Sequence, residues 1–293
     1  GGITLPVMVM SPEEHHFDQL VEHNLEPEIY SFRILESFIA LLKANKMKDY
    51  PVHLKFNTGM NRLGFEPGEL EKLVEIVKQS EEIYIQSVFS HLAAADEPGH
   101  DRFTIQQIDK FRDIAVKMEQ ALQNKIIKHL LNTSGIERFT EHQFDMVRLG
   151  IGLYGISPQS PEKLQNISAL KTRITQVKTI KKGETIGYGR KGKAKTDTVI
   201  AVIPVGYADG YSRVFSNGTG YFLINGKIAP IIGNVCMDMC FADITNVNAQ
   251  EGDEVVIFGD DLPVTELAKQ AGTIPYEILA NISRRVKRVY VQE

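Results

Sequence analysis

The first half of the chain alternates short apolar runs with segments of helical periodicity, and this alternation limits the possible folds more than any other feature. In 69–79, Leu70, Leu73, Val74 and Val77 recur at the spacing of one helix face, and 104–123 repeats in the same way. The strand-like runs between such segments are 3–10, 28–31, 52–57, 83–91, 126–132 and 146–154. Strand–helix–strand alternation predicts a parallel sheet covered by helices.

Six such units in succession favour an α/β barrel of the (β/α)8 TIM type, with about six of its eight units present. A doubly wound sheet is the alternative that the pattern leaves open. The first run has no start signal before it, and an incomplete barrel would have open strand edges. We therefore expect a truncated or fragmentary chain.

The second half has a different character, with strands close together and glycine-containing turns. Its strand-like runs are 172–182, 198–205, 221–224, 228–232 and 254–258. Asn225–Gly226 is the dipeptide of a two-residue hairpin turn, and one helix is expected at 264–271. The sequence predicts a partial (β/α)8 barrel domain at 1–160 and a mainly β C-terminal domain at 161–293.

Composition excludes some classes of partner. Of 293 residues, 43% are hydrophobic and 24% charged, and the net charge of −4 argues against nucleic-acid binding. No basic leader and no apolar run of membrane-spanning length is present, so we expect a cytoplasmic protein without a membrane partner. If VCMDMC is a strand, Cys236 and Cys240 are about 13 Å apart along it, which predicts reduced thiols and no metal site.

The segment HLKFNTGMNRLGF, residues 53–65, carries the strongest chemical signal. In a barrel strand Leu54 and Phe56 would face the helices, whereas His53, Lys55 and Asn57 would face the barrel axis. Three inward polar groups are costly unless they are paired or serve a site. A shifted register with a solvent-exposed polar face is the alternative.

Further polar residues follow the other strands of the first half. His91, in SHLAAAD, lies where barrel active sites are built, and Arg148, in MVRLGIGLYG, would point inward and need an acceptor. Gly150 and Gly152 permit close backbone approach, which suits a phosphate or a tight turn. The segment NTSG, 132–135, is compatible with phosphate binding or with plain turn chemistry.

In the second half, chemistry-bearing residues cluster around tyrosines that glycines flank. Tyr188 lies in IGYG, Tyr207 in VGYADGYSR, and Met237 and Asp238 in NVCMDM. Tyrosines flanked by glycine protrude with little local packing. All eight histidines lie at or before His142, so an acid–base group from this half must be of another type.

These motifs, in this order and spacing, resemble those of the alanine racemases, and the resemblance extends to GTIPYEILANISRRVKRVY near the end. It implies a (β/α)8 barrel that binds pyridoxal 5'-phosphate (PLP), a β domain, and a homodimer with shared sites. The implied activity is interconversion of L- and D-alanine for peptidoglycan precursor synthesis. The alternatives are an inactive racemase fragment and a related amino-acid decarboxylase.

The resemblance implies roles for individual residues. Tyr188 matches the catalytic tyrosine, one base of a two-base mechanism, which acts on the partner subunit's cofactor. His91 and Arg148 match a hydrogen-bonded chain between that tyrosine and the pyridine nitrogen. Lys55 matches a lysine that is often carbamylated and then holds Arg62, which contacts the substrate carboxylate; an uncarbamylated lysine paired with an acid is the alternative.

The binding residues follow by the same comparison. Thr133, Gly150 and Ile151 match the phosphate site. Tyr207 matches a tyrosine at the active-site entrance, and Met237 and Asp238 match residues of the substrate pocket.

Three positions depart from the family pattern. The Schiff-base lysine belongs to a motif like VKANAYGHG, which the sequence lacks, and Lys43 is a poor candidate because it lies in a helical pattern. We therefore expect the chain alone to be inactive. Arg284 replaces a frequent phosphate-contacting tyrosine and still offers an anion contact, and Asn234 replaces a frequent arginine of the access channel.

Overall fold

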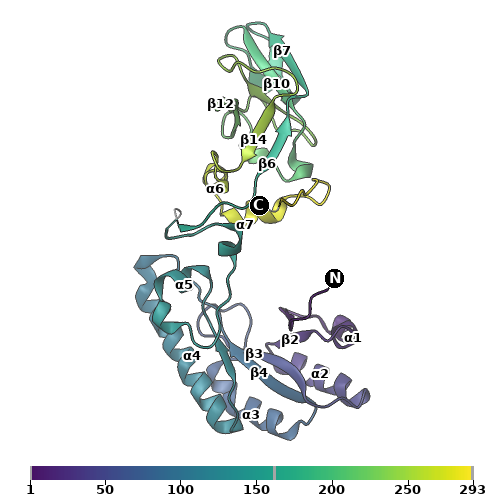
Figure 1. Ribbon diagram of the computed structural model, residues 1–293, viewed down its shortest axis with the longest axis vertical. Coiled ribbons are helices and arrows are strands. Elements are labelled where there is room, and N and C mark those ends of the chain that lie inside the picture. Colours follow the sequence, from purple (N-terminus) through teal and green to yellow (C-terminus); the bar gives the residue numbers. More distant parts are fainter. Residues whose placement is uncertain (1, 161–162, 292–293) are drawn as a thin grey trace. The chain divides into compact units, whose positions relative to one another are not determined.

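The computed structural model describes residues 2–160 and 163–291 of the chain. The chain divides into two compact units (Figure 1). Unit 1 comprises Gly1–Leu153 and Ser157–Lys163, and unit 2 comprises Tyr154–Ile156 and Leu164–Glu293.

Unit 1 is built on a parallel sheet. Its five strands are β1 (Met8–Val9), β2 (Glu26–Ile29), β3 (Tyr50–Lys55), β4 (Ile83–Phe89) and β5 (Ile127–His129). Their order in the sheet is the order in the chain, and every neighbouring pair is parallel. A doubly wound sheet reverses its strand order partway, so the structure has the arrangement of half a TIM-type barrel instead.

Helices alternate with these strands. The α-helices are α1 (Phe17–Glu22), α2 (Phe32–Ala44), α3 (Leu70–Gln79), α4 (Asp101–Leu122) and α5 (Thr133–Arg138). Short 3-10 segments are Glu14–His16, Pro67–Glu69, Pro98–His100, Thr140–His142 and Ile151–Tyr154. Helices α2, α3 and α4 line one face of the sheet (Figure 1), where Phe38, Leu73 and Phe111 share one core with Leu54 and Val88. The helices predicted near 69–79 and 104–123 are confirmed.

The prediction of six barrel strands was wrong for the described residues. At 146–154, Met146 makes a single bridge to His129, and Ile151–Tyr154 forms a 3-10 turn. Glycines at 150, 152 and 155 provide no side chains for a sheet to pack, which explains the missing strand. The first predicted run, 3–10, contains only the two-residue strand β1.

Unit 2 is mainly β. Its strands are β6 (Leu170–Arg173), β7 (Gln176–Ile180), β8 (Thr185–Ile186), β9 (Gly192–Lys193), β10 (Thr198–Ile203), β11 (Tyr221–Ile224), β12 (Lys227–Pro230), β13 (Cys240–Asp243) and β14 (Glu254–Phe258). They form sheets in the orders β13-β10-β7, β12-β11-β14-β6 and β8-β9. Two α-helices follow, α6 (Val264–Ala271) and α7 (Pro275–Asn281).

Turn chemistry in unit 2 was predictable, whereas one strand boundary was not. Asn225 and Gly226 have φ of 49° and 72°, and Ile224 pairs with Lys227, so the hairpin is confirmed. The single strand expected at 172–182 is two strands in two sheets. The change of partner occurs at Ile174, whose N–H donates to the carbonyl of Asp253 in place of a β10 residue.

The interpretation of VCMDMC as a strand was also wrong, because β13 begins only at Cys240. Residues 236–239 form a loop in which the Cys236 N–H donates to the Met239 carbonyl. The Cys236 carbonyl accepts from the Tyr207 N–H, which ties this loop to the preceding turn. Both cysteines are free thiols, Cys240 buried and Cys236 half-buried. Among the described residues, no helix combines the length and apolar character needed to cross a membrane.

Candidate active site

The face of the unit 1 sheet opposite the helices carries polar side chains. On β3, Leu54 belongs to the apolar core, whereas the buried side chains of His53 and Lys55 bond to polar groups of neighbouring strands. The predicted inward polar face is therefore confirmed for these two residues. Asn57, beyond the end of β3, instead donates to Asn61 and Glu66 in the following loop.

Hydrogen bonds link five polar side chains in a chain that crosses strands β2, β3, β4 and β5 and ends at Arg148. His53 Nε2 lies 2.8 Å from Glu26 Oε2, and His53 Nδ1 lies 2.6 Å from Ser87 Oγ. Ser87 Oγ lies 2.9 Å from His129 Nε2, and His129 Nδ1 lies 2.6 Å from an Arg148 guanidinium nitrogen. The chain joins a carboxylate to a guanidinium through neutral groups.

The donor directions in this chain follow from its two ends. Arg148 only donates, so His129 Nδ1 accepts and Nε2 carries the proton that is donated to Ser87. Ser87 then donates to His53 Nδ1, and His53 Nε2–H donates to Glu26. Burial lowers the pKa of His53 despite its contact with Glu26, in agreement with a neutral ring.

Arg148 is a cation whose hydrogen-bond acceptors are uncharged. Besides His129, its nitrogens donate to the carbonyls of Ser90 and Leu130, and one lies 3.4 Å from His91 Nδ1. Burial lowers the pKa of Arg148 to about 10, and Glu28 opposes that shift. The guanidinium therefore stays protonated at neutral pH.

The two histidines beside Arg148 are neutral. Burial, and then the charge of Arg148, lower the pKa of His91 to about 4 and that of His129 to about 3. Arg62 and Lys55 add to the shift at His91, so both cations lie near that ring. The structure thus places His91, Arg148, Lys55 and Arg62 near one another, and Arg62 itself is exposed.

Lys55 forms an ion pair with an acid, Glu28. Its Nζ lies 2.8 Å from Glu28 Oε1, and only 4% of Lys55 and 0% of Glu28 is exposed. The other carboxylate oxygen of Glu28 accepts the backbone N–H of Ser11. A buried charged pair of this kind needs such additional hydrogen bonds to offset desolvation.

The predicted phosphate residues meet at the start of α5. Thr133 is buried, and its hydroxyl oxygen accepts the N–H groups of Gly150 and Gly152 at 3.1 and 3.2 Å. Such a hydroxyl still has its own proton to donate. Asn132 caps α5 by accepting the Gly135 N–H, so NTSG begins a helix. Ile151 is buried in the same turn.

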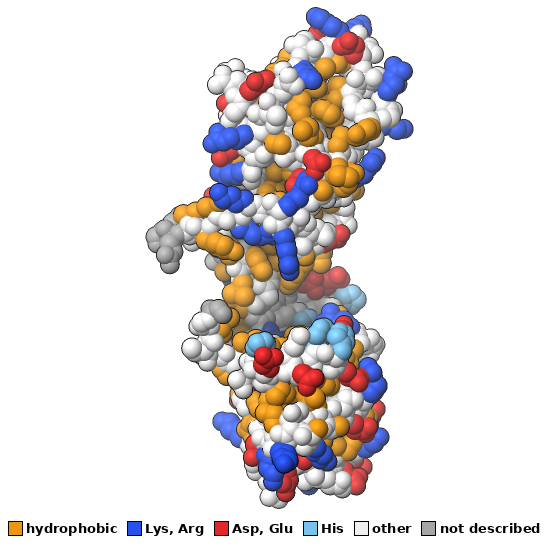
Figure 2. All heavy atoms as spheres, turned by 90° about the vertical axis from the view of Figure 1, so that its right-hand side faces the viewer, with side chains coloured by type: hydrophobic (Ala, Val, Ile, Leu, Met, Phe, Trp, Pro, Cys, Tyr) orange, Lys and Arg blue, Asp and Glu red, His pale blue; other side chains and the backbone are white. Residues whose placement is uncertain are grey.

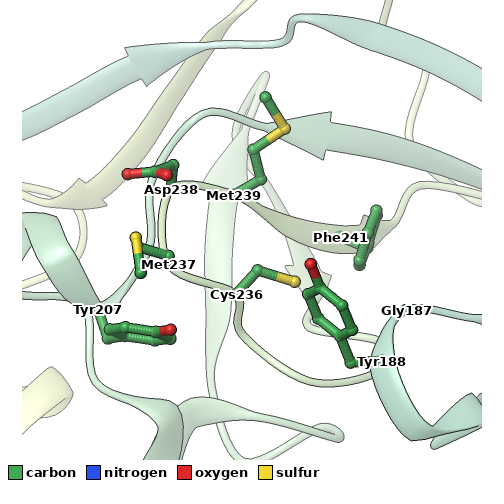
Figure 3. Close-up of a pocket in the computed structure, with 8 residues that line it drawn as sticks. All are labelled: Gly187, Tyr188, Tyr207, Cys236, Met237, Asp238, Met239 and Phe241. Carbon is green, nitrogen blue, oxygen red and sulfur yellow. The ribbon is translucent and has the colours of Figure 1, made fainter.

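Unit 2 has a cavity of about 650 Å³ around the 236–239 loop (Figure 3). Tyr188 and Tyr207 line it together with Met237 and Asp238. Tyr188 lies between Gly187 and Gly189, whose φ values of 72° and 65° favour glycine, and 73% of the tyrosine is exposed. The structure therefore brings together four unit 2 residues that the sequence singled out.

Arg285, which sequence reasoning missed, holds Asp238 in this cavity wall. Its guanidinium contacts Asp238 at 2.5 Å and Asp209 at 2.7 Å. The neighbouring Arg284 is exposed and does not line the cavity. Asn234 donates to the Tyr188 carbonyl at 3.1 Å, a contact that supports the backbone next to the tyrosine.

Glu28 and His129 were missed as well, although a signal for the first existed. In EPEI, Glu26 and Glu28 alternate with Pro27 and Ile29, and period two places both carboxylates on one face of a strand. The predicted strand began at residue 28, two residues after the start of β2, so Glu26 fell outside it. His129 had no local signal, since its importance comes from its neighbours across the sheet.

Comparison with protein-family models covers nearly all of the chain. Residues 1–158 match the model described as alanine racemase, N-terminal domain, and residues 167–290 match alanine racemase, C-terminal domain. The chain belongs to the alanine racemase family. The family resemblance inferred from the motifs is confirmed, as is a TIM-barrel-like N-terminal domain followed by a β domain.

Individual alanine racemases align with nearly the whole of this chain. Alanine racemase 1 of Clostridium acetobutylicum is 37% identical over 100% of this chain and 78% of its own length. Among solved structures, alanine racemase from a D-cycloserine-producing Streptomyces lavendulae has a TM-score of 0.93 and 31% identity, covering 100% of this chain and 79% of that one. The alanine racemase of Bartonella henselae, solved with covalently bound pyridoxal phosphate, has a TM-score of 0.87 and 27% identity over 98% and 79%. These matches favour a racemase over a decarboxylase.

Proposed function

We propose that the protein racemises alanine with PLP as cofactor, using the polar face of unit 1 to hold the cofactor and Tyr188 to move the substrate's α-proton. The observation that carries the proposal is Arg148, a protonated guanidinium that donates only to neutral acceptors. The membership of the racemase family supports the same activity.

The residues present fit PLP. A pyridine nitrogen accepts hydrogen bonds, and Arg148 can donate one without giving up its proton. The Thr133 hydroxyl, whose oxygen accepts the N–H groups of Gly150 and Gly152, keeps its own proton to donate to a phosphate beside the turn of Gly150 and Ile151, and Arg284 adds an exposed cation. When bound, PLP stabilises the negative charge that develops at the substrate's α-carbon.

Tyr188 would take or return the α-proton at its phenolic oxygen. Its exposure leaves that oxygen free of the apolar core, and glycines on both sides let the ring protrude. Asp238 and Met237 would shape the substrate pocket, with Tyr207 at its entrance. Arg62, exposed after β3, would bind the substrate carboxylate, and His91 would join Arg148 to the tyrosine.

A second copy of the chain would complete the site. Tyr188, Tyr207 and Met237 are large, exposed and line the same cavity, and hydrophobic side chains gather on the visible face of unit 2 (Figure 2). Burying such a surface favours association. We therefore infer a homodimer in which Tyr188 serves the partner's cofactor, with light scattering as the test of its mass. The cytoplasmic location stays a prediction.

The lysine that binds the PLP aldehyde is not assigned to a residue of this chain. Lys55 is ion-paired with Glu28, and Lys43 is exposed on α2. That this lysine lies outside residues 1–293 stays a prediction. Adding PLP and then borohydride tests it, because a pyridoxyl group fixed on Lys43 or Lys55 in a peptide map would contradict it.

The activity is tested by following D-alanine formed from L-alanine, and the reverse, in the complete gene product and in residues 1–293. We expect racemisation in the first and none in the second. A Tyr188→Phe variant should lose activity with an unchanged circular dichroism spectrum, whereas Tyr84→Phe, another exposed tyrosine, should keep it. Racemisation at the parent rate by Tyr188→Phe refutes the role of the tyrosine, and its absence from the complete product refutes the function.

A further inference from the structure

The ion pair between Lys55 and Glu28 lies in the interior of unit 1. Lys55 ends β3 and Glu28 lies on the adjacent strand β2, where it is in register with His53. The Lys55 Nζ to Glu28 Oε1 distance is 2.8 Å. The Ser11 N–H donates to the other oxygen of the carboxylate, so Glu28 is held from both sides.

Two cations lie near this pair, in addition to the Glu26 carboxylate that bonds to His53. Arg148 is close enough to Glu28 for the carboxylate to raise its pKa, and Lys55 is close enough to His91 to lower the pKa of that ring. Lys55 Nζ also lies 5.6 Å from the centre of the Phe89 ring, a favourable place for an ammonium ion. Glu28 is thus the anion that contacts Lys55 directly.

Carbamylation of Lys55 is incompatible with this arrangement. In that reaction the neutral amine nitrogen attacks dissolved CO2, an N–C bond forms as one C–O π bond opens, and the amine proton leaves to solvent. The product is an anion where the ammonium ion was. It would lie within hydrogen-bond distance of Glu28 in a buried environment, where like charges repel most strongly.

We propose that Glu28 supplies the negative charge that a carbamate would otherwise provide, and that Lys55 remains an unmodified ammonium ion in the working protein. Glu28 is then a positioning residue that fixes Lys55 beside His91 and Arg148. The role in catalysis rests on the proposed racemase function. The state of Lys55 does not, because it is a chemical property of the folded chain.

The decisive measurement is carbon-13 NMR of the complete protein equilibrated with carbon-13-labelled bicarbonate. We expect no carbamate signal that is lost in a Lys55→Arg variant, which distinguishes Lys55 from surface lysines. We also expect racemase activity to be the same in buffer stripped of CO2 and in buffer with added bicarbonate. A carbamate signal in the parent protein that Lys55→Arg abolishes overturns the proposal.

Removing the Glu28 carboxylate should allow Lys55 to be carbamylated. In Glu28→Gln we expect a Lys55 carbamate to appear, and activity to become dependent on bicarbonate. Glu26→Gln is the matched control, because it neutralises a carboxylate of the same strand that bonds to His53, and it should show no carbamate. If Glu28→Gln folds and stays uncarbamylated, Glu28 does not control Lys55 and the proposal fails.

These experiments test the state of Lys55 independently of the proposed racemase activity. If the variant does not fold, the parent spectrum still decides the state of Lys55. If the parent protein lacks racemase activity but also lacks the carbamate, the function fails while the ion-pair assignment stands.

Discussion

Acidification should destabilise unit 1 through three histidines whose pKa the fold lowers, His53, His91 and His129, and the size of the effect follows for the last two. In the fold the pKa is about 4 for His91 and about 3 for His129, against an ordinary value of 6.5. The unfolded chain therefore binds more protons between these values, so stability is lost as the pH falls below about 6.5. At pH 5 each histidine costs about 2 kcal/mol, from about 1.4 kcal/mol per pH unit, and the two together cost about 4 kcal/mol.

Urea unfolding at pH 7 and pH 5 measures this loss, with far-UV circular dichroism as the signal because the chain has no tryptophan. A His129→Gln variant keeps an acceptor for Arg148, and its pH-dependent loss of stability should be smaller by about 2 kcal/mol. His23→Gln, at an exposed position, should leave it unchanged. Unit 2 has no histidine, so hydrogen exchange in β10 serves as an internal reference. An equal pH dependence in His129→Gln and the parent would refute the reasoning.

Three other substitutions have distinct expected results. Gly206→Ala places a Cβ 2.3 Å from two backbone oxygens of the cavity loop, so we expect a loss of about 1–3 kcal/mol in urea unfolding and a loss of activity. Arg285→Met removes the ion pair with Asp238. Because this pair is exposed to solvent, urea unfolding should show little change in stability, while steady-state kinetics should show KM rising more than kcat falls. Gln107→Leu leaves the carbonyl of His91 without its buried donor, and thermal or urea unfolding should show a cost of about 1–3 kcal/mol.

Periodicity predicted the elements whose environment is uniform along their length. Helices α3 and α6 and strands β11 and β14 were located from their patterns because each buries one continuous face. The segment at 146–154 failed because its glycines adopt a turn that local pattern does not distinguish from a strand. The strand expected at 172–182 failed because its alternation continues while its partner strand changes at Ile174.

The polar face of unit 1 was predicted only in part. His53 and Lys55 were identified because strand alternation points them away from the apolar core. Their partners Glu28 and Ser87 are set by the register between strands, which one sequence does not encode locally. For the same reason Lys55 could be identified as inward-facing, but its ionic partner could not.

The hydrogen-bonded chain from Glu26 to Arg148 limits which substitutions this interior can accept during evolution. Every group in it has one allowed donor direction, fixed by the carboxylate at one end and the guanidinium at the other. Replacing Ser87 by alanine would leave His53 Nδ1 and His129 Nε2 without their hydrogen-bond partner in the interior. Accepted substitutions along this face should therefore arise in linked sets, and aligned relatives should covary at 53, 87 and 129 more strongly than at apolar core positions.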